Sequence, residues 1–173
     1  MFDGEKEQLN ITENTQPAIL TMSAGILSIL KEKGIEAEAV AGLSLGEYSA
    51  LYASSAIDFE TCVKLVKKRG HYMQEAVPLG DGGMTAIIGL SEEKLKECLV
   101  EARKYGVVEI SNYNTPKQLV IGGEAKAVEV AIELCKEAGA RRAVPLKVSG
   151  PFHTPLLEEA SVNLAKELNN IEF

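Results

Sequence analysis

The feature that most constrains the fold is the stretch VAGLSLGEYSAL, Val40 to Leu51, in which a serine lies between two glycines. A short apolar run, Ala37 to Ala41, predicts a buried strand before it, and the residues from Gly46 to about Ser54 favour a helix after it. At a sharp strand-to-helix turn, flanking glycines let strand and helix approach closely and lift the serine hydroxyl clear of the sheet. The pattern predicts that Ser44 is presented for reaction, although an ordinary Gly-rich turn with a capping serine has the same sequence.

Leu45, the residue after this serine, has a backbone N–H that can also take part in a reaction. The backbone N–H of Leu45 lies at the start of the predicted helix, where the first N–H groups lack acceptors within the helix and the helix dipole is positive. Such an N–H can stabilise the negatively charged oxygen of an acyl-transfer intermediate. Ser44 is therefore the predicted nucleophile, and the N–H of Leu45 is a predicted oxyanion donor.

Composition narrows the classes of function. The chain has 173 residues and a formal net charge of −7. The acidic balance argues against nucleic acid or an anionic membrane surface as a partner. No apolar run approaches the ~20 residues that a membrane span requires. The first residues, MFDGEKEQLN, lack signal-peptide character, which predicts a cytoplasmic location.

The cysteines and histidines argue against a metal site. Three cysteines, Cys62, Cys98 and Cys135, are far apart, and their spacing is not that of metal ligands. Each falls on the apolar face of a predicted helix, so we expect buried free thiols in a reducing compartment. With only two histidines, His71 and His153, a structural metal is not expected.

The order of predicted elements indicates an α/β fold. Helices are predicted from Pro17 to Gly34 and from Phe59 to Ala76, and the linker PLGDGG follows. The pattern then becomes strand, helix, strand, strand, helix, strand, over residues 84–90, 92–104, 107–113, 118–123, 124–138 and 141–149. This β-α-β-β-α-β order is that of a ferredoxin-like unit. A last amphipathic helix begins at Thr154. Only one strand is predicted outside the ferredoxin-like unit, so either further strands are missed or the chain is a fragment.

His153 is the predicted base for Ser44. It lies in SGPFHTPLL, between two prolines, where the chain leaves a strand and enters a helix. A rigid loop of this kind fixes a side chain in space, as a general base requires. A loop histidine bonded to nearby backbone would have the same sequence. His71 lies among charged residues on the polar side of its helix, where we expect a solvated surface residue.

Arg69 is the predicted anion-binding residue. It shares one helical face with Cys62, Val66 and Met73, and that face is otherwise apolar. A guanidinium buried there needs an anion, because leaving it unpaired is costly. An internal Asp or Glu, or extension of the side chain to solvent, would meet this need. The alternative is a substrate carboxylate, which the planar fork can bind through two hydrogen bonds.

Four segments together resemble a known family. In their order and spacing, GLSLGEYSAL, KKRGHYMQEA, NYNTPKQLVIGG and SGPFHTPLL are similar to the malonyl-CoA:acyl carrier protein transacylases, which belong to the acyltransferases of fatty-acid and polyketide synthesis. The resemblance covers nearly the whole chain. It implies an α/β-hydrolase-like body at residues 1–79, an inserted ferredoxin-like subdomain at 80–148, and a return to the body at 149–173.

The resemblance also implies roles for individual residues. Ser44 corresponds to the nucleophile of the family and His153 to its general base. Arg69 corresponds to the arginine that holds the malonyl carboxylate, and the N–H of Leu45 to an oxyanion donor. Gln16, in NTQPAIL, lies in a motif of that family near the active site and is given no catalytic role.

The implied activity is transfer of a malonyl group from malonyl-CoA to the pantetheine thiol of acyl carrier protein, in fatty-acid biosynthesis. It proceeds through a malonyl-serine intermediate and needs neither a metal nor a redox cofactor. Carrier proteins in such systems are acidic, so the basic clusters Lys64/Lys67/Lys68 and Arg141/Arg142 are potential docking sites. For the lysines, a solvated helix face is an equally simple explanation.

The chain departs from the family pattern in two ways. Leu43 stands before the serine, where the family often has histidine. The Gly-Gln-rich segment at the beginning of the family and the further strands at its end are both lacking, which leaves open whether these residues are active alone.

Three other interpretations remain. A serine hydrolase with the same turn would place an Asp or Glu between Ser44 and His153. Asp58 has the position of a helix cap and Asp81 that of a linker residue, while several glutamates remain available. An acyltransferase domain of a polyketide synthase would have the same motifs, and Phe152 before the histidine matches the malonyl pattern. A binding module that docks carrier protein without catalysis is the third.

Overall fold

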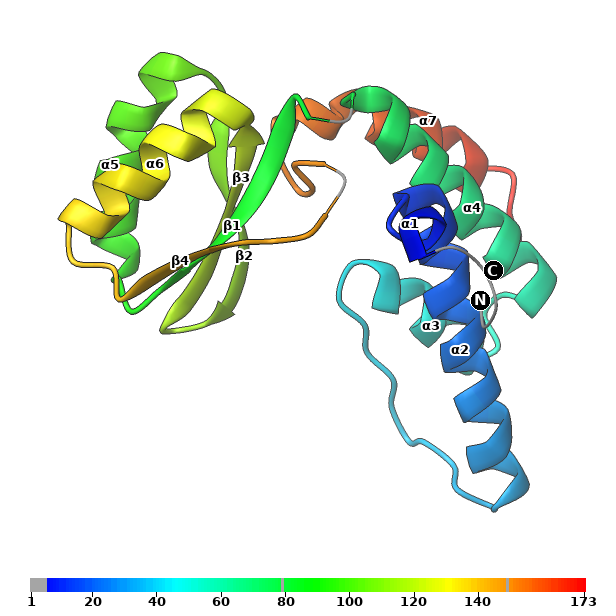
Figure 1. Ribbon diagram of the computed structural model, residues 1–173. Helices are drawn as coiled ribbons and strands as arrows, with labels where there is room; N and C mark the ends of the chain where they lie inside the picture. The colour runs from blue at the N-terminus through cyan, green and yellow to red at the C-terminus, as the bar shows by residue number, and fades with distance from the viewer. Residues whose placement is uncertain (1–5, 79, 149) are drawn as a thin grey trace. The chain divides into compact units, whose positions relative to one another are not determined.

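The computed structural model describes residues 6–78, 80–148 and 150–173 (Figure 1). The chain divides into two compact units. The first contains the described residues up to Tyr72 together with Val162–Phe173, and the second is Met73–Ser161. The boundaries expected at 79/80 and 148/149 fall at Leu79 and Ser149, which lie outside the described residues.

The first unit is built from helices. Its elements are α1 (Lys6–Leu9), α2 (Thr12–Glu32), α3 (Leu45–Ala53), most of α4 (Phe59–Ala76) and the later part of α7 (Glu158–Leu168). A buried core joins α2, α3 and α4, and α7 packs against it; its buried residues are Leu20, Tyr48, Ile57, Cys62, Leu65 and Val66. α4 has its predicted bounds, and Asp58 caps it: the Thr61 N–H donates to Asp58 Oδ1 at 2.8 Å.

α2 differs from its prediction in its start and in the face that it buries. It begins at Thr12, so Pro17 lies inside the helix rather than in its first turn, and the missing N–H of Pro17 removes one helical hydrogen bond. The buried positions recur every four residues: Thr12, Gln16, Leu20 and Ala24. The apolar residues whose repeat predicts the helix are exposed instead: Ile19, Met22, Ile26, Ile29 and Leu30. The helix is apolar on more than one side, and the described residues cover only one of them.

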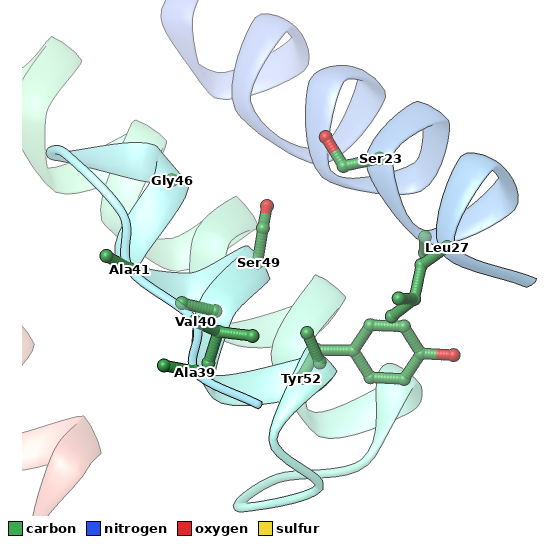
Figure 2. Close-up of a pocket in the computed structure, with 11 residues that line it drawn as sticks. Ser23, Leu27, Ala39, Val40, Ala41, Gly46, Ser49 and Tyr52 are labelled. Carbon is green, nitrogen blue, oxygen red and sulfur yellow. The ribbon is translucent and has the colours of Figure 1, made fainter. Parts of the chain in front are cut away.

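The strand expected from Ala37 to Ala41 is not formed, so that prediction is wrong. The segment has no regular structure, and the described part of the first unit contains no strand with which it could pair. A strand depends on hydrogen bonds to a neighbouring strand, so an apolar run of suitable length is not sufficient. The segment instead borders a pocket of about 350 Å³. Figure 2 shows Val40 beside Tyr52 of α3 and Leu27 of α2 in the lining of this pocket.

The second unit confirms the predicted β-α-β-β-α-β order. Its elements are β1 (Gly82–Ile88), α5 (Glu92–Ala102), β2 (Val108–Thr115), β3 (Gln118–Glu124), α6 (Ala125–Glu137) and β4 (Arg142–Pro145). Within the described residues the strands form one sheet in the order β2-β3-β1-β4, and each neighbouring pair is antiparallel. β4 is shorter than the predicted strand over 141–149, because only residues 142–145 pair with β1.

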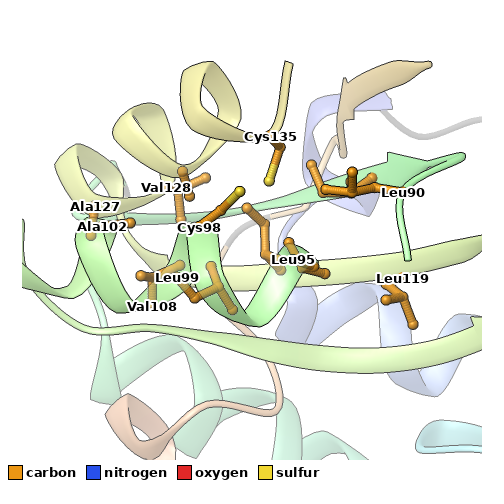
Figure 3. Packing of buried hydrophobic residues seen from close by; sticks show 13 residues of the cluster. Leu90, Leu95, Cys98, Leu99, Ala102, Val108, Leu119, Ala127, Val128 and Cys135 are labelled. Carbon is orange, nitrogen blue, oxygen red and sulfur yellow. The ribbon is translucent and has the colours of Figure 1, made fainter. Parts of the chain in front are cut away.

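Both helices of the second unit cover the same face of its sheet (Figures 1 and 3). Alternation along β1 places Ile87 in the core beneath the helices and Met84 and Ala86 in a smaller cluster on the other face. Leu95 and Leu99 of α5 are fully buried in the first of these clusters. At the start of α5 the predicted cap is formed, with the Lys94 N–H donating to Ser91 Oγ at 3.4 Å. The periodic apolar pattern of this unit therefore predicts its layers correctly.

All three cysteines are free and buried, as predicted. Desolvation raises the pKa of Cys62 to about 11, and desolvation together with the neighbouring Cys98 raises that of Cys135 to about 12. The thiols of Cys62 and Cys135 are therefore protonated at neutral pH and are poor nucleophiles. No helix in the described part of the chain is both long enough and apolar enough to cross a lipid bilayer.

Candidate active site

Ser44 occupies a strained turn directly before α3. Its backbone angles are φ 54° and ψ −112°, and a left-handed φ at a residue with a Cβ costs on the order of 1–3 kcal/mol. The turn is tight as well: a Cβ on Gly42 would lie 2.0 Å from the backbone carbonyl carbon and oxygen of Gly46. Leu45 is the first residue of α3, so its N–H is among those that the helix cannot satisfy internally. This is the local geometry expected of a nucleophile turn, with a segment of no regular structure in place of the strand.

The two glycines of the motif are expected to respond differently to alanine. Gly42→Ala forces backbone against backbone and is expected to destabilise the chain by about 1–3 kcal/mol, as overpacking does. Gly46 lies in α3, and a Cβ there would meet no heavy atom within 4 Å, so Gly46→Ala should stabilise by roughly 0.5–1 kcal/mol through helix propensity. Denaturant unfolding of both variants measures this difference. Equal stabilities would contradict the close approach at Gly42.

Arg69 joins three helices at this turn. It is buried in α4, with 9% of its surface exposed. Its Nη2 donates to Ser44 Oγ at 3.0 Å, and its Nη1 donates to Gln16 Oε1 of α2 at 2.5 Å. The guanidinium carbon lies 5.4 Å from the centroid of the Tyr48 ring of α3, within the range of a cation–π contact. The prediction that Arg69 lies on a buried face is confirmed, and its guanidinium is directed to the predicted nucleophile.

The charge of Arg69 is not neutralised by a carboxylate in the described part of the chain. Among those residues, no Asp or Glu oxygen lies within ion-pair distance of its guanidinium. Burial lowers the pKa of Arg69, while interactions with Tyr48 and the charge of Glu47 oppose that shift. An arginine remains protonated at neutral pH nonetheless. The arrangement therefore presents a buried positive charge beside a serine hydroxyl, which suits a substrate with a carboxylate.

His153 lies in the second unit, in a loop held against β1. Its φ is 60°, a left-handed conformation in which histidine is enriched among non-glycine residues. On one side of it Thr154 is buried and donates its hydroxyl to Pro151 O at 2.7 Å. Pro151 is fully buried, and its ring leaves no room for a Cβ on Gly82 of β1. The loop thus fixes the backbone of His153 while its side chain stays exposed.

The predicted site residues fall into both units. Ser44, Leu45 and Arg69 lie together in the first unit and His153 lies in the second, so the pairing of His153 with Ser44 stays a prediction. His71 is on the surface as expected, with its Nδ1 3.4 Å from Glu13 Oε2. Within residues 6–78, 80–148 and 150–173, no group of His, Cys, Asp or Glu side chains is arranged to hold a metal ion.

Gln16 is the residue whose contact the sequence reasoning missed. Its side-chain oxygen accepts from Arg69 although the two residues are 53 positions apart. A signal was present: Gln16 lies four residues from Leu20 and eight from Ala24, on one helical face. A polar residue on the buried face of a helix needs a polar partner. The missing information was which face of α2 is buried.

Comparison with known proteins identifies the family. A family model described as the acyl transferase domain matches residues 2–173. The chain belongs to the acyl transferase domain family. It is 49% identical over 170 residues to a malonyl CoA-acyl carrier protein transacylase of Bacillus subtilis, covering 98% of this chain and 54% of that protein. It is also similar to the solved structure of a malonyl transacylase in complex with a type II PKS acyl carrier protein, with 48% identity and a TM-score of 0.95.

A second solved structure is similar to this chain to a comparable degree. The chain is 55% identical to the solved structure of MCAT from Streptococcus pneumoniae, with a TM-score of 0.90. The match covers 99% of this chain and 56% of that one. The chain thus spans about half the length of the curated relatives and solved structures that it matches.

Proposed function

We propose that this chain takes part in the transfer of a malonyl group from malonyl-CoA to the pantetheine thiol of acyl carrier protein, in fatty-acid biosynthesis. The observation that carries the proposal is the buried guanidinium of Arg69, which has no carboxylate partner among the described residues and donates to Ser44 Oγ. A malonyl group differs from an acetyl group by a carboxylate, which is the group that such a guanidinium favours. The names of the relatives agree with this substrate.

Binding is the first step of the proposed mechanism. The guanidinium has five N–H donors, and it donates to Gln16 and Ser44 and also forms a hydrogen bond with Tyr48. In the proposal, donors beyond these bind the malonyl carboxylate. Holding the carboxylate at Arg69 keeps the substrate close to the hydroxyl with which its thioester reacts.

Acylation of Ser44 is the second step of the proposed mechanism. His153 takes the hydroxyl proton while Ser44 Oγ forms a bond to the thioester carbon, and the carbonyl oxygen becomes an oxyanion that the Leu45 N–H stabilises. The carbon–sulfur bond then breaks. Coenzyme A leaves as its thiol after His153 returns the proton, and a malonyl ester remains on Ser44.

The second half of the reaction reverses these events with a different thiol. His153 takes the proton of the pantetheine thiol of the carrier protein, and the sulfur attacks the ester carbon. The carbon–oxygen bond breaks, Ser44 recovers the proton from His153, and malonyl carrier protein leaves. Each proton has a donor and an acceptor, so the proposed reaction needs neither a metal nor a redox cofactor.

Replacing Arg69 by alanine tests the proposed substrate. We expect acylation by malonyl-CoA to slow roughly ten- to hundredfold, because a charge-assisted pair of about 1.5–3 kcal/mol is lost. Acylation by acetyl-CoA, which has no carboxylate, should be unchanged or faster. The measurement is the ratio of the two kcat/KM values, from the mass of the intact protein over time. Arg69→Lys should restore the ratio only in part, because an ammonium lacks the planar fork.

The outcome that contradicts this substrate is an unchanged ratio in Arg69→Ala. Arg103→Ala is the matched control, because Arg103 pairs with Glu109 on the surface of the second unit and has no part in the proposed reaction. Its ratio should equal that of the wild type.

Charge pairing favours one of the two basic clusters as the proposed docking site for an acidic carrier protein. Lys64, Lys67 and Lys68 are each paired with a glutamate, at 2.5, 3.0 and 2.6 Å respectively. Within the described residues Arg141 and Arg142 have no ion-pair partner, and Arg141 borders a pocket of about 460 Å³ together with Lys117. We therefore favour the arginines as the carrier-binding cluster.

We also propose how the chain is divided into a body and an insert. The body is α/β-hydrolase-like and occupies residues 1–79, a ferredoxin-like insert occupies 80–148, and the chain returns to the body at 149–173. The element order and sheet order of the second unit support the insert. The similarity to solved malonyl transacylases supports the body. The cytoplasmic location stays a prediction.

A serine hydrolase is the alternative that the geometry favours less. Such an enzyme needs a carboxylate to orient the histidine. Asp58 already caps α4, because its Oδ1 and Oδ2 each accept a hydrogen bond from Thr61 at 2.8 Å. A hydrolase also gives no reason for an uncompensated arginine beside the nucleophile.

A further inference from the structure

A buried amide side chain lies next to the proposed carboxylate-binding arginine. Gln16 is 4% exposed and lies on the buried face of α2. Its Oε1 accepts from Arg69 Nη1 at 2.5 Å, and its Nε2 lies 3.4 Å from Thr12 Oγ1. Arg69 has only donors, so the amide must direct its oxygen to the guanidinium and its NH₂ elsewhere. The orientation of Gln16 is thus fixed by chemistry as well as by packing.

The contacts of Arg69 define the plane of its guanidinium. Nη1 is bound to Gln16 of α2, and Nη2 is bound to Ser44 at the start of α3. The ring of Tyr48 lies 5.4 Å from the guanidinium carbon. A planar fork that is fixed before the ligand arrives loses less entropy on binding a carboxylate. Gln16 supplies the contact to Nη1.

We infer that Gln16 is a positioning residue that orients Arg69 with a neutral acceptor, and so leaves the arginine charge uncompensated for a substrate carboxylate. The inference rests on the proposed function, in which Arg69 receives that carboxylate. A glutamate at this position would reach the same Nη1 but would neutralise the guanidinium. An apolar residue would leave a buried donor unsatisfied and the fork free to turn. The amide meets both requirements, since it accepts a hydrogen bond and has no charge.

Gln16→Glu is the direct test, because it changes charge with almost no change of shape. We expect acylation of Ser44 by malonyl-CoA to slow roughly ten- to hundredfold, the range for loss of a charge-assisted bond, while acylation by acetyl-CoA stays within about twofold. Gln8→Glu is the control for added charge, because Gln8 is an exposed residue near the start of the same unit. Its ratio of malonyl to acetyl acylation rates should match that of the wild type.

Gln16→Met is the second variant, in case the glutamate variant does not fold. It keeps the length of the side chain and the charge of Arg69 but removes the acceptor. We expect malonyl acylation to slow by less than in Gln16→Glu, again with little change for acetyl-CoA. Equal slowing with both acyl groups in either folded variant would mean that Gln16 serves only the fold, and would overturn the inference. An unchanged ratio in Gln16→Glu would overturn it as well.

A spectroscopic measurement separates this inference from the proposed function. If malonyl-CoA does not acylate Ser44 in the wild type, the proposed function fails, but the side-chain N–H resonances of Arg69 still test the contact with Gln16. Rotation of the guanidinium should be slow in the wild type, faster in Gln16→Met and slow in Gln16→Glu. The exposed Arg142 is the reference for free rotation. If Arg69 in the wild type rotated as fast as Arg142, Gln16 would not orient it.

Discussion

Replacing Ser44 by alanine is expected to abolish covalent acylation by malonyl-CoA while the chain still folds. The hydroxyl is the only group lost, and alanine has no atom that can form the ester. Serine and alanine both have a Cβ, so the cost of the left-handed φ of 54° is the same for both. The loss of the acceptor for Arg69 Nη2 should destabilise the chain by about 1 kcal/mol. The mass of the intact protein after brief incubation measures acylation, and thermal unfolding measures stability.

Ser49→Ala is the matched control for this experiment. Ser49 lies in the same helix, α3, and lines the neighbouring pocket rather than the turn. In the Ser49→Ala variant, Ser44 is intact and should be acylated at the wild-type rate. A malonyl mass increase that persists in Ser44→Ala would place the ester on another residue and remove the basis of the proposed mechanism.

The sequence predicts well those elements whose pattern is repeated and whose partners lie nearby in the chain. α4 has its predicted bounds because an N-cap and a regular apolar repeat define it. The order β1 to β4 in the second unit follows from alternating strands and capped helices within one contiguous segment. Burial of Cys62, Cys98 and Cys135 follows from the same helical repeat. Local pattern is sufficient where the burial partner is close in sequence.

The errors concern elements whose packing neighbours the local sequence does not specify. The residues from Ala37 to Ala41 have the composition of a buried strand, but no described strand of the first unit lies beside them. For α2, apolar residues occur on several sides of the helix, so the repeat predicts a helix without indicating the buried face. A single sequence gives the periodicity of an element but not the position of its neighbours.

The candidate site was partly predictable for the same reasons. The turn at Ser44 and the burial of Arg69 follow from glycine spacing and from helical periodicity. The contact between them spans 25 positions, and the contact of Arg69 with Gln16 spans 53. Both depend on how α2 and α3 pack against α4. The chemical need of a buried guanidinium indicates that a partner exists, but only the packing identifies it.

Replacing His153 is expected to have the second large effect, a loss of roughly 10²–10⁴-fold in the rate of Ser44 acylation, which is the usual range for a general base. His153→Asn is the preferred variant. The residue has φ 60°, and asparagine tolerates that left-handed conformation better than alanine does. The buried partners on either side of it, Pro151 and Thr154, should hold the loop in place. Initial rates of the intact mass increase, measured with saturating malonyl-CoA, give the ratio of variant to wild type.

His71→Asn distinguishes the two histidines of the chain. His71 contacts Glu13 on an exposed surface of α4, and its side chain is 48% exposed. An exposed pair of this kind contributes at most about 1 kcal/mol to stability, so the variant should fold and react at nearly the wild-type rate. If His71→Asn were the slow variant and His153→Asn the fast one, the base would be in the first unit and the two roles would be reversed. If both variants reacted normally, proton transfer from Ser44 would not depend on histidine, and Arg69, the cation within hydrogen-bond distance of its hydroxyl, would be the group to test next.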